Sequence, residues 1–416
     1  MLDLKRAAAW AAMLAFPAIG LALGAGGPAP AAAPAEPGAP VAAPAEVAAP
    51  DDGHGPDPAP PGVDYTKPAP IVVPATADRI YCDGNGTSGH RVKAIYAVAS
   101  DRPNRADEVV PAIPAWAGTV ERVFSRSAEK TGGVRHVRWV HSNSASCALD
   151  VDTVVLSPAG DNSFAATQAE LRAMGYTDPT RKYMVWVDAT ALCGIAQMYP
   201  DDSASQANDN NGRYSMMSRI DSGCWGFSDS VEAHELMHNL GGVQNTSPNS
   251  SKKGHCVDES DRMCYRDGGK KMKAVCTTAG GEALFDCNND DYFNTNPAAG
   301  SYLATRWNAA NSRFLVNPST TPLPAAVSTL RGGLTKKKPI GYHWIGASTG
   351  AASVQFKAKK AAASDFTVTL SDGYTPVATG RGTSTFTLEG TVTVEGQHLI
   401  TVEGPKGAYT LTVTRQ

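Results

Sequence analysis

The stretch 229–244, DSVEAHELMHNLGGVQ, constrains this chain of 416 residues more than any other part of it. His234 and His238 are four residues apart, so on a helix their imidazoles lie on one face and can bind a single cation. Glu235 lies beside them, where a carboxylate can accept a proton from a metal-bound water. The pattern therefore predicts a zinc site on a short helix.

Polar residues and a glycine mark the two ends of this helix. Ser228, Asp229 and Ser230 offer N-cap side chains, and Asp229 with Glu232 has the spacing of a capping box. Gly241 permits the positive φ with which many helices end. We therefore expect a helix that begins just before His234 and ends soon after His238.

The run HELMHNLG at 234–241 matches H-E-x-x-H-x-x-G, so the chain resembles the metzincin clan of zinc metallopeptidases in its bacterial secreted form. The resemblance implies a Met-turn after the helix, and Met263 in DRMCY occupies that place. It gives Tyr265 a role in binding the metal or the substrate oxyanion. The implied activity is zinc-dependent endopeptidase hydrolysis with Glu235 as general base.

The third protein ligand of the metal is open at this point. The clan has His or Asp where this chain has Gln244, and an amide oxygen is a weak, uncharged ligand for zinc. His255 lies in a polar, glycine-containing loop that can return to the helix, and we predict it as the third ligand. Gln244 and Asp258 are the alternatives.

The cysteines indicate an oxidising compartment. All eight lie between residues 82 and 287, and an even number within one segment is typical of disulfides rather than of a thiolate metal cluster. Their order suggests four pairs, although other connectivities are open: Cys82 with Cys147, Cys193 with Cys224, Cys256 with Cys264, and Cys276 with Cys287.

The first 76 residues divide into two parts. Residues 1–25 place Lys5 and Arg6 before an apolar stretch that ends in small residues, which is typical of a signal peptide and predicts a secreted, extracellular protein. An uncleaved anchor is the alternative, which Pro17 disfavours. Residues 26–76 are rich in Ala and Pro, so we expect an extended linker; it holds no cysteine that could silence a zinc site.

Residues 77–318 alternate between strand and helix patterns, which predict an α+β domain. The metzincin resemblance implies that this domain is peptidase-like and that its mixed sheet precedes the zinc helix. An edge strand of that sheet would let an extended peptide add by main-chain hydrogen bonds. We expect strands at 91–100, 151–157 and 183–189 and helices at 112–131, 165–175 and 301–316. The metzincin resemblance implies that the edge strand lies at 212–220.

Residues 325–416 change to short alternating runs separated by Gly, Asp and Lys, which predict an all-β sandwich. The closing AYTLTVT resembles pre-peptidase C-terminal or immunoglobulin-like modules. Three roles are open for such a module at this point: contact with a cell wall or extracellular matrix, binding of substrate, and stabilisation of the enzyme alone. A formal net charge of −3 provides no basic field for nucleic acid. We expect a monomer that acts on a protein or peptide.

Oxygen donors cluster in DCNNDDYF, after the expected Met-turn. Asp286, Asn288, Asp290 and Asp291 can bind a structural Ca²⁺, and a hydrogen-bonded polar turn is the alternative. For the whole chain the alternative function is an exported adhesion or binding protein that keeps a degenerate, non-catalytic metalloprotease fold. Gln244 favours that alternative, whereas an intact Glu235 favours an enzyme.

Overall fold

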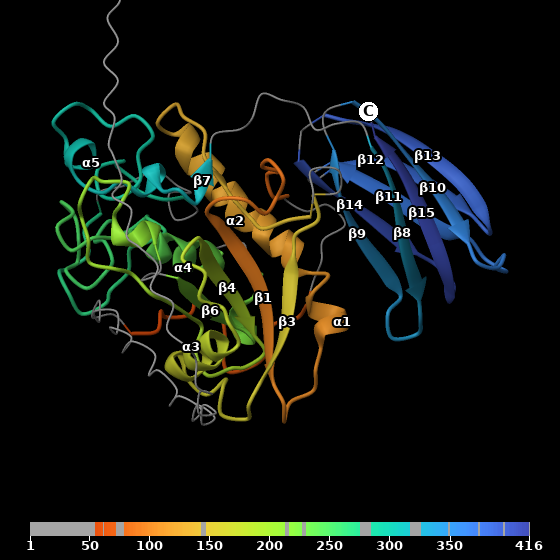
Figure 1. Ribbon diagram of the computed structural model, residues 1–416, viewed down its shortest axis with the longest axis horizontal. Coiled ribbons are helices and arrows are strands. Elements are labelled where there is room, and N and C mark those ends of the chain that lie inside the picture. Colours follow the sequence, from red (N-terminus) through yellow and green to blue (C-terminus); the bar gives the residue numbers. More distant parts are fainter. Residues whose placement is uncertain are drawn as a thin grey trace, which may run out of the picture. The chain divides into compact units, whose positions relative to one another are not determined.

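The computed structural model describes residues 55–60, 62–71, 79–142, 147–212, 216–226, 230–274, 284–316, 326–347, 350–372, 375–393 and 396–415. The expected signal peptide and most of the expected linker lie outside these residues. The fold is α+β, with a five-stranded sheet followed by a C-terminal region of two four-stranded sheets (Figure 1). The predicted fold class is confirmed.

The five-stranded sheet is mixed and has the order β3-β1-β4-β6-β5. Four strands run parallel, and the short β5 pairs antiparallel with β6 at one edge. The predicted strands near 91, 151 and 183 are confirmed. The strands are β1 (Arg91–Ala99), β3 (Val151–Leu156), β4 (Arg181–Val187), β5 (Gly194–Ala196) and β6 (Met217–Asp221).

The predicted edge strand at 212–220 is wrong. Its described part becomes β6, which has β4 on one side and β5 on the other. The edge of the sheet is β5, whose three residues are too few to show an alternating pattern. Residues 213–215 lie outside the described part of the chain.

Helices cover both faces of this sheet. Alternate residues of β1 point to opposite sides, as the period of a strand requires: Tyr96 packs in one core cluster with Trp116 and Leu236, and Ile95 in another with Leu171. The first cluster lies under α2 (Ile113–Glu129) and α4 (Val231–Asn239), which also contact each other (Figure 1). The second lies under α3 (Phe164–Ala173). The helices predicted at 112–131 and 165–175 are confirmed.

The helix predicted at 301–316 is wrong. This stretch holds only the short helix α5 (Tyr302–Thr305), the 3-10 turn η4 (Ala309–Asn311) and the strand β7 (Leu315–Val316), which pairs with β2 (His136–Val137). The side chain of Asn308 accepts a hydrogen bond from the Ala310 amide and competes with a helical backbone. Trp307 is buried instead, and its Nε1 donates to the Leu240 carbonyl at the end of α4.

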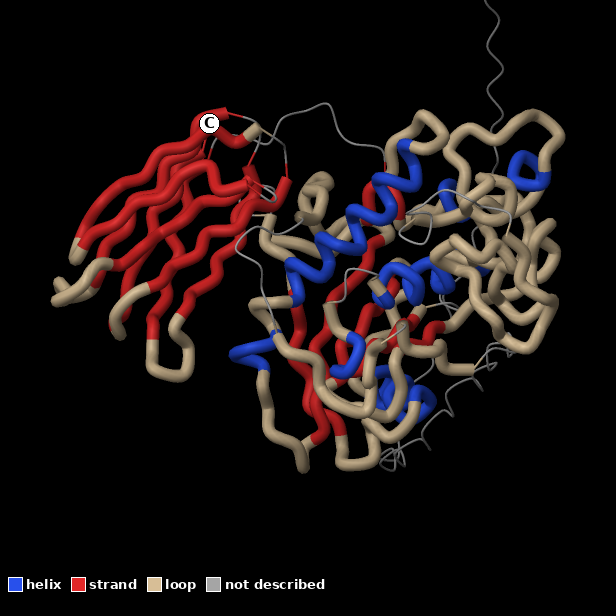
Figure 2. The backbone as a smooth tube through the Cα atoms, turned by 180° about the vertical axis from the view of Figure 1, so that it is seen from behind, coloured by secondary structure: helices blue, strands red, loops and turns tan. Residues whose placement is uncertain are grey.

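The C-terminal region consists of antiparallel strands, drawn red in Figure 2. Its sheets have the orders β13-β10-β15-β8 and β12-β11-β14-β9 and share one apolar core, as the sequence predicts for a sandwich. Its strands are β8 (Ala326–Leu334), β9 (Ile340–Ala347), β10 (Gly350–Ala358), β11 (Phe366–Asp372), β12 (Thr375–Gly382), β13 (Thr385–Val392), β14 (Gly396–Glu403) and β15 (Gly407–Arg415).

Three disulfides stabilise the region around the large sheet. The predicted pairs Cys82–Cys147, Cys193–Cys224 and Cys256–Cys264 are confirmed. Cys287 is also disulfide-bonded, whereas Cys276 lies outside the described residues. Disulfides of this kind persist in an oxidising compartment.

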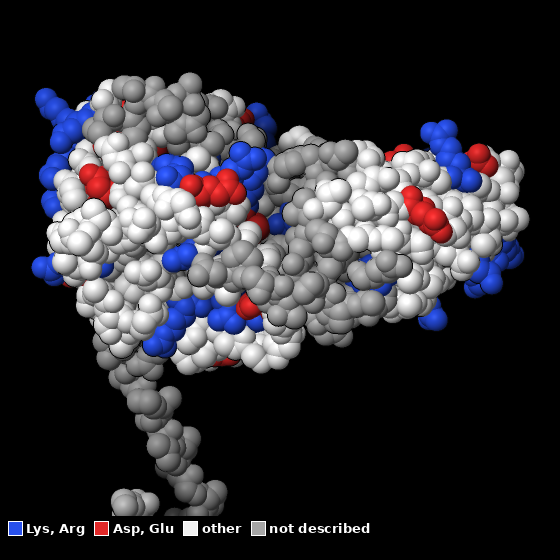
Figure 3. Space-filling view, turned by 90° about the horizontal axis from the view of Figure 1, so that it is seen from above, with Lys and Arg blue, Asp and Glu red and all other residues white. Residues whose placement is uncertain are grey.

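Two further findings concern the described residues as a whole. Among them, no helix has both the length and the apolar character that crossing a bilayer requires. On the face shown in Figure 3, Lys and Arg side chains are interspersed with Asp and Glu.

Candidate metal centre

The helix α4 brings the histidine pair to the centre of the site. Its N-cap is Ser230, whose hydroxyl accepts a hydrogen bond from the Ala233 amide at 3.1 Å. Oε1 of Glu232 accepts from Gly226 N and Trp186 Nε1. The other two predicted caps, Ser228 and Asp229, lie outside the described residues.

The C-terminal end of α4 matches its prediction. Gly241 has a φ of +89°, in the left-handed region where a side chain is strained. A Cβ at this position would also lie 2.6 Å from Nε1 of Trp307, the atom that bonds to the last turn of the helix. Glycine is therefore required here, both for the backbone and for the close packing.

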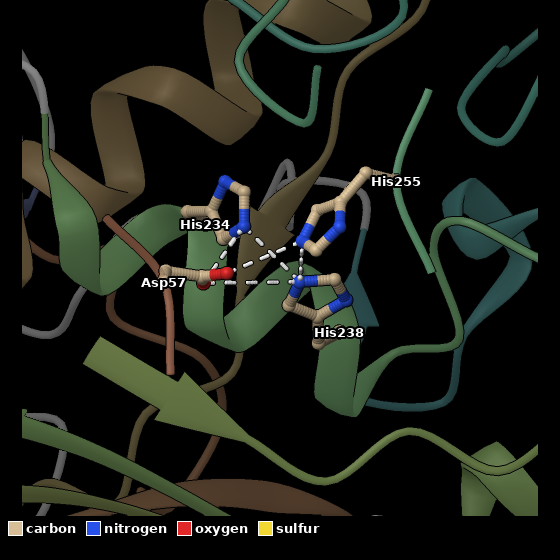
Figure 4. Close-up of side chains that lie close together, drawn as sticks. All are labelled: Asp57, His234, His238 and His255. Carbon is tan, nitrogen blue, oxygen red and sulfur yellow. Dashed lines mark hydrogen bonds and ion pairs between the residues drawn. The ribbon is translucent and has the colours of Figure 1, made fainter. Parts of the chain in front are cut away.

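Three imidazole nitrogens converge at one point (Figure 4). Nε2 of His238 lies 3.1 Å from Nε2 of His234 and 3.2 Å from Nε2 of His255. The first two side chains come from α4 and the third from the following loop, and all three are buried. The Asp57 carboxylate completes a group of four that can hold a metal ion.

The spacing of these atoms fits a tetrahedral zinc site. With metal–nitrogen distances of about 2.0–2.1 Å, two ligand atoms of a tetrahedron are about 3.3 Å apart. The separations between the histidine nitrogens lie close to that value. Oδ2 of Asp57 lies 3.0 Å from Nε2 of His234, and Oδ1 lies 3.2 Å from Nε2 of His255.

Hydrogen bonds at the far side of two rings orient them. Nδ1 of His234 donates to the carbonyl of Arg262 at 2.8 Å, and Nδ1 of His255 donates to the Asp267 carboxylate at 3.1 Å. With the proton held at Nδ1, the lone pair of Nε2 faces the centre, which is how zinc-binding histidines are commonly oriented.

The carboxylates around His255 favour its protonated form, so a metal that binds at Nε2 displaces the proton there. Burial lowers the pKa of His255, but hydrogen bonds to Asp267 and Asp57 outweigh it and raise the pKa to about 9. Burial raises the pKa of Asp267, but His255 and Ser251 lower it to about 2. Asp267 is therefore a carboxylate at neutral pH, and it makes the imidazole a better electron donor to a metal.

Glu235 lies beside the cluster without belonging to the group of ligands. Its side chain is fully buried, and Oε1 lies against the edge strand at Gly194. It also lines, with His234 and Tyr265, a cavity of about 190 Å³ next to the histidines. The position suits a carboxylate that exchanges protons at the metal.

Tyr265 lies over the histidines. Its ring centroid is 4.2 Å from that of His255 and 6.1 Å from that of His234. Its hydroxyl donates to Oδ1 of Asp57. Burial, and then the Asp57 carboxylate, raise the pKa of Tyr265, so the group is a neutral donor.

The remaining predicted residues lie away from the point where the nitrogens meet. Nε2 of Gln244 donates to the carbonyls of Tyr199 and Gly241, both at 3.0 Å, so its amide supports the loop after α4. Asp258 belongs to a separate group with Asp290 and Asp291.

Met263 is fully buried in the large core. Its carbonyl accepts a hydrogen bond from the amide of Cys256, the residue after His255. Met263 is therefore linked through the backbone to the loop that carries the third histidine.

Asp57 is a residue of the site that the sequence pattern does not predict. This residue lies in the stretch 26–76, which composition alone predicts as a linker. In the structure its amide donates to the Gly194 carbonyl at 2.9 Å, and its side chain is 5% exposed. The signal available in the sequence is weak: one carboxylate between two prolines, Pro56 and Pro58.

No model of a known protein family matches the sequence, and no curated protein matches it. Among solved structures, OgpA from Akkermansia muciniphila is similar over 80% of this chain and 94% of its own, with 8% identity and a TM-score of 0.25. A catalytically inactive OgpA in complex with an O-glycopeptide substrate is similar over 82% of this chain and 97% of its own, with 10% identity and a TM-score of 0.24.

The lysozyme inhibitor PliG, a periplasmic protein of Aeromonas hydrophila, is similar over 23% of this chain and 92% of its own, with 15% identity and a TM-score of 0.17. With TM-scores this low, none of these likenesses assigns a role to a residue of this chain.

Proposed function

We propose that this protein is a zinc-dependent endopeptidase of the metzincin type. The observation that carries the proposal is the convergence of three histidine Nε2 atoms at 3.1 and 3.2 Å beside the buried carboxylate of Glu235. Three protein ligands leave one position open for water or substrate, as catalytic zinc sites require. A purely structural site has no need of a buried general base.

The donor set suits zinc. Neutral imidazoles are good ligands for this ion, and a carboxylate and a carbonyl hold the far nitrogens of His255 and His234. When bound, zinc polarises a carbonyl group and lowers the pKa of a water molecule toward neutrality.

The chain's own residues then move the protons. Glu235 accepts the proton of the attacking water and delivers it to the leaving amine. The Tyr265 hydroxyl, a neutral donor beside His255, stabilises the oxygen on which negative charge develops. Its present acceptor, Asp57, has to move away before this contact forms.

The edge strand β5 supplies the binding surface for an extended peptide. The carbonyl of Gly194 faces away from β6 toward segment 55–60, where it accepts from the Asp57 amide. A substrate backbone can make the same bond, which brings its scissile carbonyl next to the histidines. The substrate class we propose is therefore a protein or peptide in extended conformation.

We further infer that the protein is secreted and acts as a monomer outside the cell. Support comes from the three disulfides and from the signal-peptide pattern of residues 1–25. We propose that the C-terminal sandwich contacts a cell wall or matrix rather than the scissile bond, because every candidate catalytic residue precedes residue 317.

Digestion of casein by the protein as its host secretes it tests the function. We expect hydrolysis that 1,10-phenanthroline abolishes and added Zn²⁺ restores, in a buffer with Ca²⁺ in excess. Glu235→Gln should keep the metal and lose hydrolysis, whereas Glu259→Gln, an exposed control, should retain both. Hydrolysis that persists in the phenanthroline-treated protein would exclude a zinc peptidase.

A further inference from the structure

Segment 55–60, GPDPAP, lies along the edge of the sheet at the metal centre. The amide of Asp57 donates to the Gly194 carbonyl at 2.9 Å, in an antiparallel bridge to β5. Pro58, Ala59 and Pro60 line the 190 Å³ cavity beside Glu235. The segment therefore takes the place that an added peptide strand would occupy.

The Asp57 carboxylate lies where the open position of the metal is expected. Its two oxygens are 3.0 Å from Nε2 of His234, 3.2 Å from Nε2 of His255 and 4.0 Å from Nε2 of His238. One oxygen also accepts the Tyr265 hydroxyl hydrogen. The Asp57 side chain thus lies at the expected fourth corner of the tetrahedron. It also accepts the hydrogen bond of the Tyr265 hydroxyl, the group proposed to stabilise the oxyanion.

Prolines in segment 55–60 allow the segment to lie in the cleft and make it a poor substrate. Pro58 restricts Asp57 to an extended conformation, so little entropy is lost when the strand adds to β5. Pro56 and Pro58 have no N–H, so the side of the segment that faces away from β5 offers no amide of these two residues to a further strand. The bond after Asp57 is itself an imide to proline.

The chain is held again a few residues later. The Ala69 amide donates to the Ser222 carbonyl at 2.7 Å. A Cβ at Gly223 would lie 2.2 Å from the Tyr65 carbonyl oxygen, so the two backbones are in close contact. Because the segment belongs to the same chain, its effective concentration at the cleft is high, and modest contacts are sufficient to hold it.

We infer that segment 55–60 is an inhibitory strap in which Asp57 binds the metal in place of water and substrate. The inference rests on the proposed peptidase function for its consequence, but not for the ligand contact itself. The strap has to leave, by displacement or by cleavage of the chain beyond it, before a substrate can pair with Gly194.

The full-length chain carrying Asp57→Ala tests the strap. The matched control is Asp64→Ala, which removes an exposed carboxylate that bonds within its own turn to Thr66 and Lys67. Asp57→Asn keeps the shape of the side chain and guards against misfolding. Each protein is loaded with Co²⁺ for its visible spectrum and with Zn²⁺ for hydrolysis of a short peptide.

We expect Asp57→Ala to change the Co²⁺ spectrum and to raise kcat/KM by about 10-fold or more over the uncut wild type, because the open fraction limits activity. Asp64→Ala should do neither. An unchanged spectrum and rate in Asp57→Ala, with phenanthroline-sensitive hydrolysis in all variants, would overturn the strap and leave the peptidase standing. A changed spectrum without hydrolysis in any variant would overturn the peptidase and keep the ligand.

An independent observation concerns three carboxylates in the loops after His255. Asp258, Asp290 and Asp291 each place an oxygen within 4.8 Å of the other two. Asp258 is 0% exposed and Asp291 is 1% exposed. Burial, and then the neighbouring carboxylates, raise the pKa of Asp258 to about 7, because like charges are crowded here.

The nearby acids differ in how they are bonded. The Asp286 carboxylate accepts the backbone amides of residues 290–293, so it stabilises the polar turn that the sequence offered as the alternative to calcium. Both oxygens of Asp258, Oδ1 of Asp290 and Oδ2 of Asp291 are buried and accept no hydrogen bond from the described residues. Unsatisfied buried oxygens are costly unless a cation binds them.

We propose that Asp258, Asp290 and Asp291 bind one Ca²⁺. Carboxylate oxygens in flexible loops suit this hard cation. The ion would join the loop that follows His255, which the Cys256–Cys264 disulfide closes, to the turn built around Asp286. The site differs from the one expected from the sequence, because Asp258 takes the place of Asp286 and Asn288.

Thermal unfolding of the zinc-loaded full-length chain with and without Ca²⁺ tests this site. We expect Ca²⁺ to raise the Tm of the wild type and of Glu259→Gln, the exposed neighbour, but not of Asp258→Asn. Without Ca²⁺, Asp258→Asn should be at least as stable as the wild type, because it removes a crowded charge. An equal Ca²⁺ shift in Asp258→Asn, or no shift in the wild type at millimolar Ca²⁺, would refute the site.

Discussion

A Cβ atom on Gly194 would lie 2.0 Å from Oε1 of Glu235. The edge strand and the proposed general base are therefore in direct contact, and the absence of a side chain at position 194 allows the carboxylate its place. The same glycine offers its carbonyl to the strap at the metal centre. Gly194 thus contacts both the proposed base and the segment that lies at the proposed peptide site.

Gly194→Ala should displace the Glu235 carboxylate and leave the metal in place. A shift of the order of 1 Å in a catalytic group can lower the rate about 100-fold, and we expect kcat to fall by about that factor. Zinc content and Tm should stay near wild type, which separates misplacement from unfolding. The control is Ala196→Ser, a substitution on the same strand. Full activity in Gly194→Ala would show that the contact does not position the base.

Substitutions at and around the metal centre should lower zinc affinity by different amounts. Loss of an outer hydrogen-bond partner commonly costs about 10–100-fold in affinity, and we expect Asp267→Asn to fall in that range. His255→Ala should cost more, because it removes a ligand, and Gln244→Ala should cost less. Dissociation constants from competition with a chelator measure all three. A Gln244→Ala protein that loses zinc while His255→Ala retains it would reverse the assignment.

The pair His136 and Glu121 should make stability depend on pH. Nδ1 of His136 bonds to the Glu121 carboxylate, which joins β2 to α2. Burial lowers the pKa of His136, but Glu121 raises it, with a net rise. The ion pair therefore stabilises the fold fully below the unfolded pKa of about 6.5, and this contribution is lost as pH rises through the higher folded value.

Tm measured from pH 6 to pH 9 with zinc in excess tests this pair. Glu121→Gln should destabilise the protein at pH 6 by about 1–3 kcal/mol, the range for a hydrogen bond to a charged group. The difference between variant and wild type should shrink as pH rises. A difference that stays constant across this range would show that the charge on His136 is not involved.

The C-terminal sandwich should be dispensable for hydrolysis of a short peptide. A chain ending after Val316 keeps the large sheet, the histidines and the three disulfides. We expect its zinc content to be unchanged and its kcat/KM on a short peptide to stay close to that of the full chain. Loss of hydrolysis in a truncated protein that folds and binds zinc would mean that the sandwich helps to form the site.

Local spacing explains why much of the site could be predicted from the sequence. His234, Glu235 and His238 lie within one turn of a helix, so their relation follows from helical geometry. His255 could be predicted as a ligand because it lies in a short, polar loop that can return to the helix. The strands β1, β3 and β4 and the helices α2 and α3 are long enough for their apolar periodicity to identify them.

Long-range contacts explain what the sequence could not reveal. Asp57 meets His234 across 177 positions, and nothing in an Ala/Pro-rich stretch indicates that it packs against a distant edge strand. Trp307 and Phe314 have helical spacing, yet Trp307 bonds to the end of α4 and the stretch bends around it. Tertiary contacts decided both cases, and such contacts leave little trace in local periodicity.

The central claim is that three histidines would hold zinc and that Glu235 acts as the base in peptide hydrolysis. The most direct test compares Asp57→Ala with Asp57→Ala/Glu235→Gln, each shown to hold zinc, on a short peptide, because removal of the strap makes the cleft accessible in both. We predict one zinc per chain in each protein and hydrolysis only where Glu235 is intact. Equal hydrolysis by the two proteins, or none by Asp57→Ala with zinc bound, would contradict this account.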